Sequence, residues 1–392
     1  MALMEVSAPH RRRWRAMLAL VAAVVVATSG GYALWHAGAA GPASNPIEIG
    51  DGVAGPAGMV HVPGGEFLMG SDSQLAQPNE KPAHKVRVHG FWMDQHHVTN
   101  AEFRKFVEAT RYVTTAERPP EWETLMVQLP PGTPRLPDSA LVAGGMVFVG
   151  TARPVPLRDF SQWWRYVPGA DWRHPAGPGS SIEGRDDHPV VQVSYEDAQA
   201  YAKWAGKRLP SEAEWEFAAR GGLEQATYAW GDKFAPDGRQ MANVWQGKQA
   251  QPFPVLSPKA GGAPGTSPVG TFPANGYGLF DMTGNAWQWV ADWYRADQFR
   301  REAAAGGVPA DPEGPADAWD PDDPGVPPNA PRRVTRGGSF LCNEDYCLSY
   351  RPSARRGTDP YSSMSHLGFR LVMDDSAWAG MRRRQVASTR TE

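Results

Sequence analysis

Glycine and proline interrupt this chain throughout its length, with 42 and 37 residues among 392, about a fifth of the total. Both residues break up regular helices and strands, because glycine is flexible and proline lacks a backbone N–H donor. The chain also carries 16 tryptophans, and large aromatic side chains can fill a core between irregular loops. The sequence therefore predicts a loop-rich domain with an aromatic core.

The charge balance limits the classes of partner. Charged residues make up 21% of the chain and apolar residues 41%, a mixture that excludes wholesale disorder. The formal net charge is −3, whereas a protein that binds nucleic acid through phosphate contacts needs an excess of basic residues. We predict no nucleic-acid partner.

The first 40 residues have the pattern of an export signal. Arginines at 11–13 and 15 precede an apolar run over 16–27, which continues with fewer apolar residues to Trp35. A basic flank before about twelve apolar residues is typical of a secretory signal, and about twenty such residues can span a bilayer. Residues 1–40 are therefore predicted to be a signal peptide, cleaved near 37–39, or an N-terminal membrane anchor. Either way, we expect the body of the protein outside the cytoplasm, periplasmic or secreted.

The rest of the chain is predicted to form one domain with flexible flanks. Residues 41–58 are rich in Gly, Pro, Ala and Ser, as in a flexible linker. The domain itself is expected over 59–374, with a mobile surface insertion near 300–331, where Pro, Asp, Ala and Gly recur. Residues 375–392 are polar, include three consecutive arginines at 382–384, and are expected to fray.

Three helices can be predicted from their first turns. In each, a Ser or Thr is followed three residues later by an acidic residue, which is the pattern of a capping box. The pairs are Thr99 with Glu102, Ser194 with Asp197, and Ser211 with Glu214. Apolar residues at helical spacing follow each pair. Glycines at 206 and 221 are expected to end the second and third helices.

Only two cysteines occur, Cys342 and Cys347, and four residues separate them. In an oxidising compartment the pair can form a local disulfide. A zinc site is a poor match, because no second thiol pair or spaced histidine pair accompanies it. Two thiolates alone suit a soft ion of low coordination number such as Cu(I), and they leave room for a third thiolate from a substrate. The spacing alone does not decide between these interpretations.

The sequence around the cysteines resembles the formylglycine-generating enzymes, also called sulfatase-modifying factors. Its two most specific elements are the Gly-Gly-Ser-Phe-Leu-Cys stretch at 337–342 and the Trp-Arg-His-Pro stretch at 172–175. The other matching stretches, in family order, are 62–70, 98–103, 188–190, 204–215, 243–247, 275–279, 284–289 and 362–370. Together the matches cover about residues 59–374.

The resemblance implies an α+β domain with the formylglycine-generating-enzyme fold, a C-type-lectin-like core and little regular secondary structure. It also implies copper- and O2-dependent oxidation of a cysteine in a target sulfatase to Cα-formylglycine. In that family the target cysteine lies in a Cys-x-Pro-x-Arg type motif, which binds as an extended peptide. The implied partner is therefore an unfolded or partly folded sulfatase polypeptide.

The resemblance assigns roles to four residues near the carboxyl end. Cys342 and Cys347 match the two thiols that hold Cu(I). Ser339 matches a serine that lines the oxygen pocket, and Trp287 matches an indole beside it. A hydroxyl can hydrogen-bond to an oxygen species, and an indole restricts the access of water.

The family also implies structural Ca²⁺, bound by oxygen ligands. The predicted ligands are Asp281, Gly284, Ala286 and Gln288 for one ion, and Asn243 and Val244 for a second. A glutamate is usual where Gln288 stands, so the loss of one charge predicts weaker binding. His366 stands where the family usually has Asn, which predicts a different peptide preference.

Two other functions have to be weighed against the copper oxidase. A non-catalytic extracytoplasmic binding module on the same lectin-like scaffold would not need the cysteine pair or Ser339. A non-haem iron oxidase would need a clustered His-x3-His-x-Glu set on a helical domain, and the sequence has neither. We therefore expect the copper oxidase and keep the binding module as the alternative.

Overall fold

The computed structural model describes residues 47–246, 252–256, 264–323 and 326–388. The predicted signal or anchor segment, residues 1–40, lies outside these ranges. Within them, no helix is both long enough and apolar enough to cross a membrane. Residues from Ile47 onward form one compact unit.

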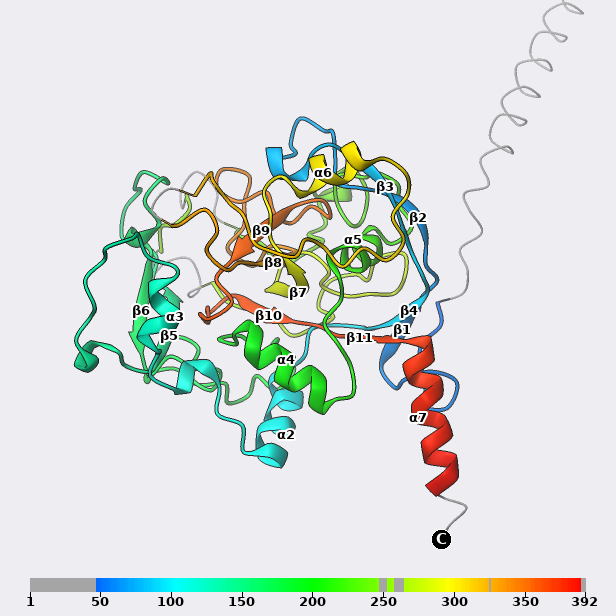
Figure 1. Cartoon of the computed structure of the whole chain (residues 1–392), viewed down its shortest axis with the longest axis horizontal. Coiled ribbons are helices and arrows are strands. Elements are labelled where there is room, and N and C mark those ends of the chain that lie inside the picture. Colours follow the sequence, from blue (N-terminus) through cyan, green and yellow to red (C-terminus); the bar gives the residue numbers. More distant parts are fainter. Residues whose placement is uncertain (1–46, 247–251, 257–263, 324–325, 389–392) are drawn as a thin grey trace, which may run out of the picture. The chain divides into compact units, whose positions relative to one another are not determined.

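Short strands build four small sheets in the described part of the chain (Figure 1). One has the order β1-β4-β11, a second has the order β10-β7-β8-β9, and the pairs β2-β3 and β5-β6 stand apart. Pairing is antiparallel except between β10 and β7, which are parallel. The strands are β1 (Met59–Val62), β2 (Gly65–Met69), β3 (His84–Val88), β4 (Phe91–Asp94), β5 (Gly144–Phe148), β6 (Trp164–Pro168), β7 (Trp287–Trp293), β8 (Arg333–Arg336), β9 (Arg355–Thr358), β10 (Leu367–Phe369) and β11 (Val372–Asp374).

The three predicted helices are confirmed. Each capping-box hydroxyl accepts a hydrogen bond from the backbone N–H three residues later, and each acidic partner reaches back to the cap. These helices are α2 (Asn100–Thr110), α4 (Tyr195–Trp204) and α5 (Glu212–Arg220). The others are α3 (Trp122–Met126), α6 (Gln298–Ala305) and α7 (Asp375–Ser388). We did not predict these three, because they are short or strongly polar.

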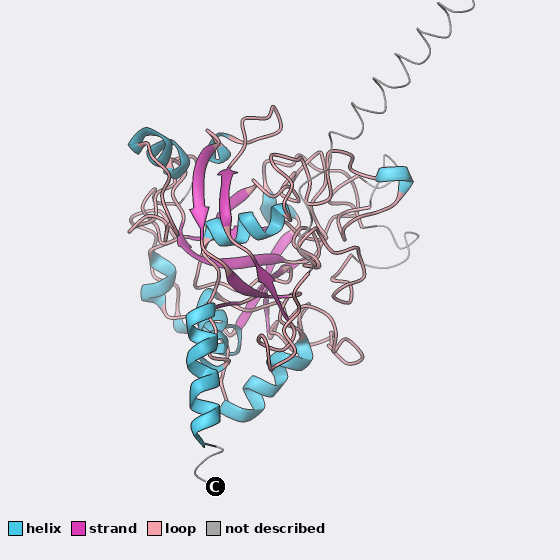
Figure 2. Ribbon diagram, turned by 90° about the vertical axis from the view of Figure 1, so that its right-hand side faces the viewer, coloured by secondary structure: helices cyan, strands magenta, loops and turns pink. Residues whose placement is uncertain are grey.

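Loops make up much of the fold, as Figure 2 shows, and the core that they help to enclose is aromatic. Trp163, Trp172, Trp215 and Trp289 are all fully buried. Aromatic rings meet edge-on or stacked across elements distant in sequence, for example Phe103 with Phe369 and Tyr195 with Trp289. Mixed helix and sheet with modest regular structure is therefore the observed architecture, as the sequence predicted.

The structure differs from the expected flexible linker over residues 47–58. Ile49 forms a β-bridge with Val60, and the Gly50 N–H donates to the Met59 carbonyl at 2.8 Å. Gly55 lies directly against the Trp92 ring. A Gly- and Pro-rich composition indicates irregular backbone, but it does not show whether that backbone packs on the domain.

The segment over 300–331 and the tail over 375–388 also differ from expectation. The first begins inside α6, whose Phe299 is buried, and its backbone pairs with β3 through Arg87 N–H to Pro309 at 2.9 Å. The second forms α7, where Trp378 and Met381 pack against Met59. In both segments, described residues contact partners distant in sequence, which a local composition does not reveal.

Candidate active site

The loop that carries both cysteines begins where β8 ends. Two glycines, at 337 and 338, turn the chain away from the sheet, each with a positive φ. The Gly284 N–H donates to the Gly337 carbonyl at 2.8 Å, and the Phe340 N–H donates to the Asn285 carbonyl at 3.1 Å. The cysteine loop therefore lies beside the turn that precedes β7.

Cys342 and Cys347 are joined by a disulfide, and their Cα atoms are 4.6 Å apart. Cys342 is 1% exposed, whereas Cys347 is half-buried. The Cys347 N–H donates to the Asn343 carbonyl at 3.0 Å, which closes the turn between them. Once reduced, the two sulfur atoms fit a soft ion such as Cu(I), because one turn holds both in contact distance of each other.

Trp287 and Ser339 lie close to this pair in the fold. Trp287, the first residue of β7, is 3% exposed and belongs to the same core cluster as Cys342. Ser339 is fully buried, and its hydroxyl oxygen accepts a hydrogen bond from the Leu341 N–H at 3.3 Å. The Cys342 N–H in turn donates to the Ser339 carbonyl at 2.9 Å. The structure thus gathers the four predicted residues around one loop.

An aromatic cluster under the cysteine loop was missed from the sequence. Tyr346, between the two cysteines, stacks on Phe253 with ring centroids 4.4 Å apart and meets Trp163 edge-on. The backbone N–H of Trp245 donates to the Cys342 carbonyl at 3.0 Å. The adjacent tryptophans at 163–164 were the available signal, because two successive indoles need a large apolar surface to cover them.

A buried ionic cluster lies where the cysteine loop leaves β8. Arg336, the last residue of β8, is fully buried and donates to Glu212 and Glu216 of α5. Burial alone would raise the pKa of Glu216, but the charges of Arg220 and Arg336 outweigh it, so its pKa lies below the usual value. The capping box at Ser211 begins the helix that presents both carboxylates. The local sequence of α5 thereby places the two carboxylates that hold Arg336, the residue directly before the cysteine loop.

Replacing Gly337 by Ala should destabilise the fold by about 2–3 kcal/mol. Gly337 has a φ of +91°, and an added Cβ would lie 2.7 Å from the Met282 carbonyl oxygen. The matched control is Gly132→Ala, where φ is +84° but no atom lies within 4 Å. Urea unfolding should show a smaller loss for the control, and equal losses would contradict the steric argument.

The residues predicted for the first calcium ion lie just before and at the start of β7, where protein donors contact several of their oxygens but the buried Asp281 Oδ1 has no hydrogen-bond partner among the described residues. The Gln288 side-chain oxygen accepts from Trp215 Nε1 at 2.9 Å and from Arg370 Nε at 2.7 Å. Arg370 also donates to the Asp281 carbonyl at 3.0 Å, and His97 Nε2 occupies the Ala286 carbonyl at 2.9 Å. A buried guanidinium therefore contacts the Gln288 side-chain oxygen and the Asp281 backbone carbonyl but not the Asp281 carboxylate.

The residues predicted for a second calcium ion also bind protein donors. The Asn243 carbonyl accepts from the Asn285 N–H at 2.8 Å, and the Val244 carbonyl accepts from Gln246 Nε2 at 2.9 Å. No group of three or more His, Cys, Asp or Glu side chains in the described ranges is arranged to hold a metal ion. Calcium binding at these residues stays a prediction.

His366 lies next to Trp287 and Trp164. Its carbonyl accepts the Trp287 N–H at 2.8 Å, and its ring lies 4.6 Å from the Trp164 ring centroid. Its Nδ1 is buried and has no hydrogen-bond partner among the described residues. Burial, together with the charge of Arg356, lowers the pKa of His366 to about 3. The ring is therefore neutral at physiological pH.

His366 should make the fold sensitive to acid. In the unfolded chain a histidine takes up a proton near pH 6.5, whereas folded His366 resists it down to about pH 3. Its contribution to stability is thus present above pH 6.5 and is lost as the pH falls. Relative to His366→Asn, the wild type should lose about 2 kcal/mol between pH 7 and pH 5 in urea unfolding. Parallel stability profiles of the two proteins would contradict this assignment.

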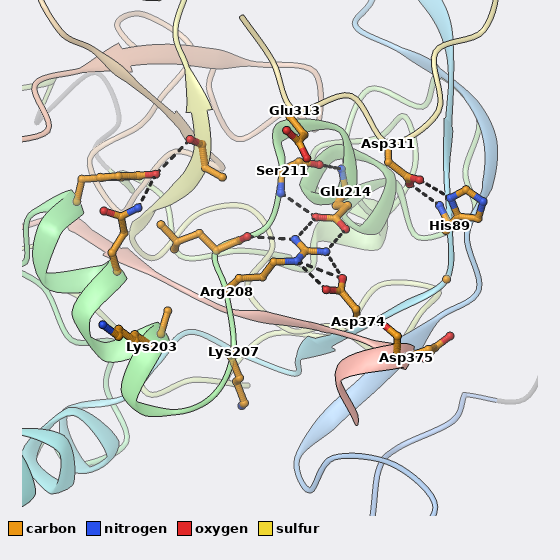
Figure 3. Close-up of a pocket in the computed structure, with 17 residues that line it drawn as sticks. His89, Lys203, Lys207, Arg208, Ser211, Glu214, Asp311, Glu313, Asp374 and Asp375 are labelled. Atoms are coloured by element: carbon orange, nitrogen blue, oxygen red, sulfur yellow. Dashed lines mark hydrogen bonds and ion pairs between the residues drawn. The ribbon is translucent and has the colours of Figure 1, made fainter. Parts of the chain in front are cut away.

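A pocket of about 1030 Å³ lies at another place, between α4, the α4–α5 loop and the start of α7 (Figure 3). Its charged groups are largely paired: Arg208 contacts Glu214 and Asp374, and His89 contacts Asp311. None of the predicted catalytic residues lines it. We assign it no part in the chemistry.

Known proteins similar to this chain match it over almost the whole described range. The model of the sulfatase-modifying factor enzyme 1-like domain matches residues 51–375. A formylglycine-generating enzyme of Mycobacterium tuberculosis is 48% identical over 318 residues, which cover 81% of this chain and 97% of that protein. A formylglycine-generating enzyme of Thermomonospora curvata is 44% identical over 335 residues, 85% of this chain and 97% of that protein.

One similar protein has a different name. A Mus musculus protein, called inactive C-alpha-formylglycine-generating enzyme 2, is 37% identical over 317 residues, 80% of this chain and 85% of that protein. The two formylglycine-generating enzymes above are more similar to this chain than the Mus musculus protein is, so the chain is classed with the enzymes. The extent of the match does establish kinship: this chain belongs to the sulfatase-modifying factor enzyme 1-like family.

Proposed function

We propose that this chain oxidises a cysteine of a target sulfatase to Cα-formylglycine, with Cu(I) as cofactor and O2 as co-substrate. The observation that carries the proposal is the position of both cysteines on one short turn, beside a buried hydroxyl and a buried indole. The proteins named formylglycine-generating enzymes, at up to 48% identity, support it.

Cys342 and Cys347 would hold the metal. When bound, Cu(I) supplies reactivity toward O2 and a coordination position for the thiolate of the substrate. Cys342 is buried on the core side of the site, whereas Cys347 is half-buried, so a substrate thiolate can approach the site from the side of Cys347. Trp287 covers the site with an apolar surface that excludes water, and the Ser339 hydroxyl can donate a hydrogen bond to bound oxygen.

The electron balance of the reaction gives the disulfide a role. Conversion of a CH2–SH group to an aldehyde and sulfide is a two-electron oxidation, whereas reduction of O2 to water takes four electrons. A thiol reductant must therefore supply the other two. The same reductant opens the bond between Cys342 and Cys347, since thiolates attack disulfides by exchange. We propose that the disulfide is the resting form of the site.

The substrate follows from the same chemistry. A thiolate can reach the half-exposed Cys347 only as part of an extended or loosely folded chain, because a folded sulfatase would bury it. We propose that the partner is an unfolded or partly folded sulfatase polypeptide with a Cys-x-Pro-x-Arg type motif. The Asn-to-His difference at 366 would alter which flanking residues are preferred.

A non-catalytic binding module remains the second candidate, and the disulfide is the observation that favours it. A permanent bond would simply brace the loop. The two candidates differ in what reduction does: it creates the active site of an oxidase, whereas it removes a brace from a binding module.

The test is a peptide assay with purified protein. The protein is reduced, loaded with one equivalent of Cu(I), and incubated with O2, a thiol reductant and a Cys-x-Pro-x-Arg peptide. Mass spectrometry should show conversion of the thiol to an aldehyde, and a Cu(I) chelator or removal of O2 should stop it. A matched peptide with Ser in place of Cys is the control. Complete absence of product from the copper-loaded protein would refute the proposal.

We further propose that the enzyme works outside the cytoplasm. The support is the arginine-rich flank and apolar run over residues 11–35, in the order that export signals require. Cell fractionation with an antibody against the folded domain should find the protein in the membrane or extracytoplasmic fraction. Recovery with cytoplasmic markers would contradict this localisation.

A further inference from the structure

One surface of the domain combines exposed apolar side chains with unpaired basic charge. Ile47, Ile49 and Val53 are 52%, 53% and 63% exposed, within seven residues of each other. Large apolar residues rarely expose that much area together without a partner. This segment lies beside α7, since Trp378 Nε1 of that helix donates to the Ala54 carbonyl at 3.2 Å (Figure 1). We call the exposed residues on either side of this contact, Ile47, Ile49 and Val53 on one segment and Arg382–Arg384 on α7, the α7 face.

The base of α7 is firmly attached to the domain. Trp378 and Met381 pack against Met59, Trp92 and Met373. Just before the helix, Asp374 pairs with Arg208, as Figure 3 shows. The helix therefore presents its later residues in a fixed position relative to the apolar segment.

The positive charge of the α7 face is available for a partner. Arg383 and Arg384 are exposed, and the Arg382 guanidinium lies 5.9 Å from the Trp378 ring centroid. In the part of the chain that the structure describes, none of the three arginines forms an ion pair with a carboxylate. The nearby carboxylates are engaged: Glu48 and Asp375 both face His61, and Asp51 accepts from the Val53 and Ala54 N–H groups.

The chain itself limits where this face can go. Ile47 follows Trp35, the last residue of the apolar stretch, by only twelve residues. Twelve residues span at most about 40 Å when fully extended. An anchor in the apolar stretch would therefore tether the domain within this distance of the bilayer.

We propose that the α7 face rests on a membrane surface that contains anionic lipid. Arginines are attracted to anionic headgroups, and each one near the surface strengthens association by about fivefold. Exposed Ile and Val side chains can enter the headgroup region. Apolar and basic groups in one patch suit lipid better than either a nucleic acid or a purely acidic protein. This inference concerns a surface separate from the cysteine loop and goes beyond the proposed function.

The experiment uses the full chain in nanodiscs of phosphatidylcholine, with or without phosphatidylglycerol. Hydrogen exchange of backbone amides over 376–388 should slow by about tenfold in the discs that contain phosphatidylglycerol. The variant R382Q/R383Q/R384Q should lose this protection. The matched control R153Q/R158Q/R239Q removes the same charge from exposed arginines elsewhere and should keep it.

A second measurement separates the lipid contact from the anchor. Because residues from Ile47 onward form one compact unit, a chain of residues 41–392 can be sedimented with phosphatidylglycerol vesicles. The triple variant at 382–384 should partition more than about tenfold more weakly than the control variant. Its activity on a soluble peptide should equal that of the wild type.

Several results would overturn the proposal. Equal exchange in both kinds of disc, or equal loss in both triple variants, would exclude a role for these arginines in lipid binding. Protection that appears without lipid and grows with protein concentration would identify a second copy of the chain as the occupant instead.

Discussion

Replacing either Cys342 or Cys347 by Ser lowers peptide conversion by more than about 100-fold. Loss of a group that only orients a metal ligand already costs about 10–100-fold in metal affinity or activity, and loss of the ligand itself costs more. After reduction, the wild type should bind one Cu(I) per chain, and each single variant should bind none. The measurements are peptide conversion by mass spectrometry and copper content after gel filtration.

The same variants distinguish a catalytic pair from a structural brace. If the disulfide only braces the loop, the double variant and the reduced wild type should share one reduced stability, and neither should bind copper. If the pair is catalytic, reduction should switch the wild type on and leave the variants inactive. Ser362→Ala, in a nearby stretch of the family pattern, is the control and should keep conversion within a few-fold. Substantial conversion by Cys342→Ser would remove the copper pair from the mechanism.

Replacing Arg336 by Met destabilises the fold by about 3–5 kcal/mol, the usual cost of removing one partner from a buried ionic cluster. Arg336 is completely buried, and it satisfies Glu212, Glu216 and the carbonyls of Pro352 and Ser353. Methionine has a similar length but cannot donate, so Glu216 Oε2 and the carbonyls of Pro352 and Ser353 lose this donor, although Arg355 and Arg220 still contact the two carboxylates. Denaturant unfolding at pH 7 measures the loss.

Two further variants serve as controls for this prediction. Arg104→Met breaks the exposed Arg104–Asp186 pair and should cost less than about 1 kcal/mol, since surface pairs contribute little. Arg336→Lys keeps the charge and should fall between the wild type and Arg336→Met. A loss below about 1 kcal/mol for Arg336→Met would mean that the cluster does not hold the end of β8.

The sequence predicted those parts of the fold whose cause is local. The helices α2, α4 and α5 were predicted correctly, because a capping box and an apolar stripe lie within a few residues of each other. Helix α7 was not predicted, because its apolar residues Trp378 and Met381 pack against Met59 and Trp92, which are distant in sequence. The segment over 47–58 was missed for the same reason. Contacts between distant segments order both.

For the site, too, the sequence predicted features that depend on neighbouring residues and missed contacts that depend on distant ones. Five positions along the chain bring Cys342 and Cys347 within reach of each other, so their proximity followed from spacing, whereas their redox state did not. The calcium prediction rested on residues near 281–288 and took no account of Arg370, which lies about eighty residues later and donates to two members of that group. The Trp163–Tyr346 contact likewise joins residues far apart.

The attachment of the thiol-bearing loop to α5 has a consequence for biogenesis. Its anchoring arginine follows its helix partners by more than a hundred residues, and the carbonyls of Pro352 and Ser353 complete the anchor still later. A growing polypeptide therefore cannot assemble this anchor until the chain has been made at least as far as Ser353. The cysteine loop thus takes up its position late, after nearly the whole domain has been synthesised.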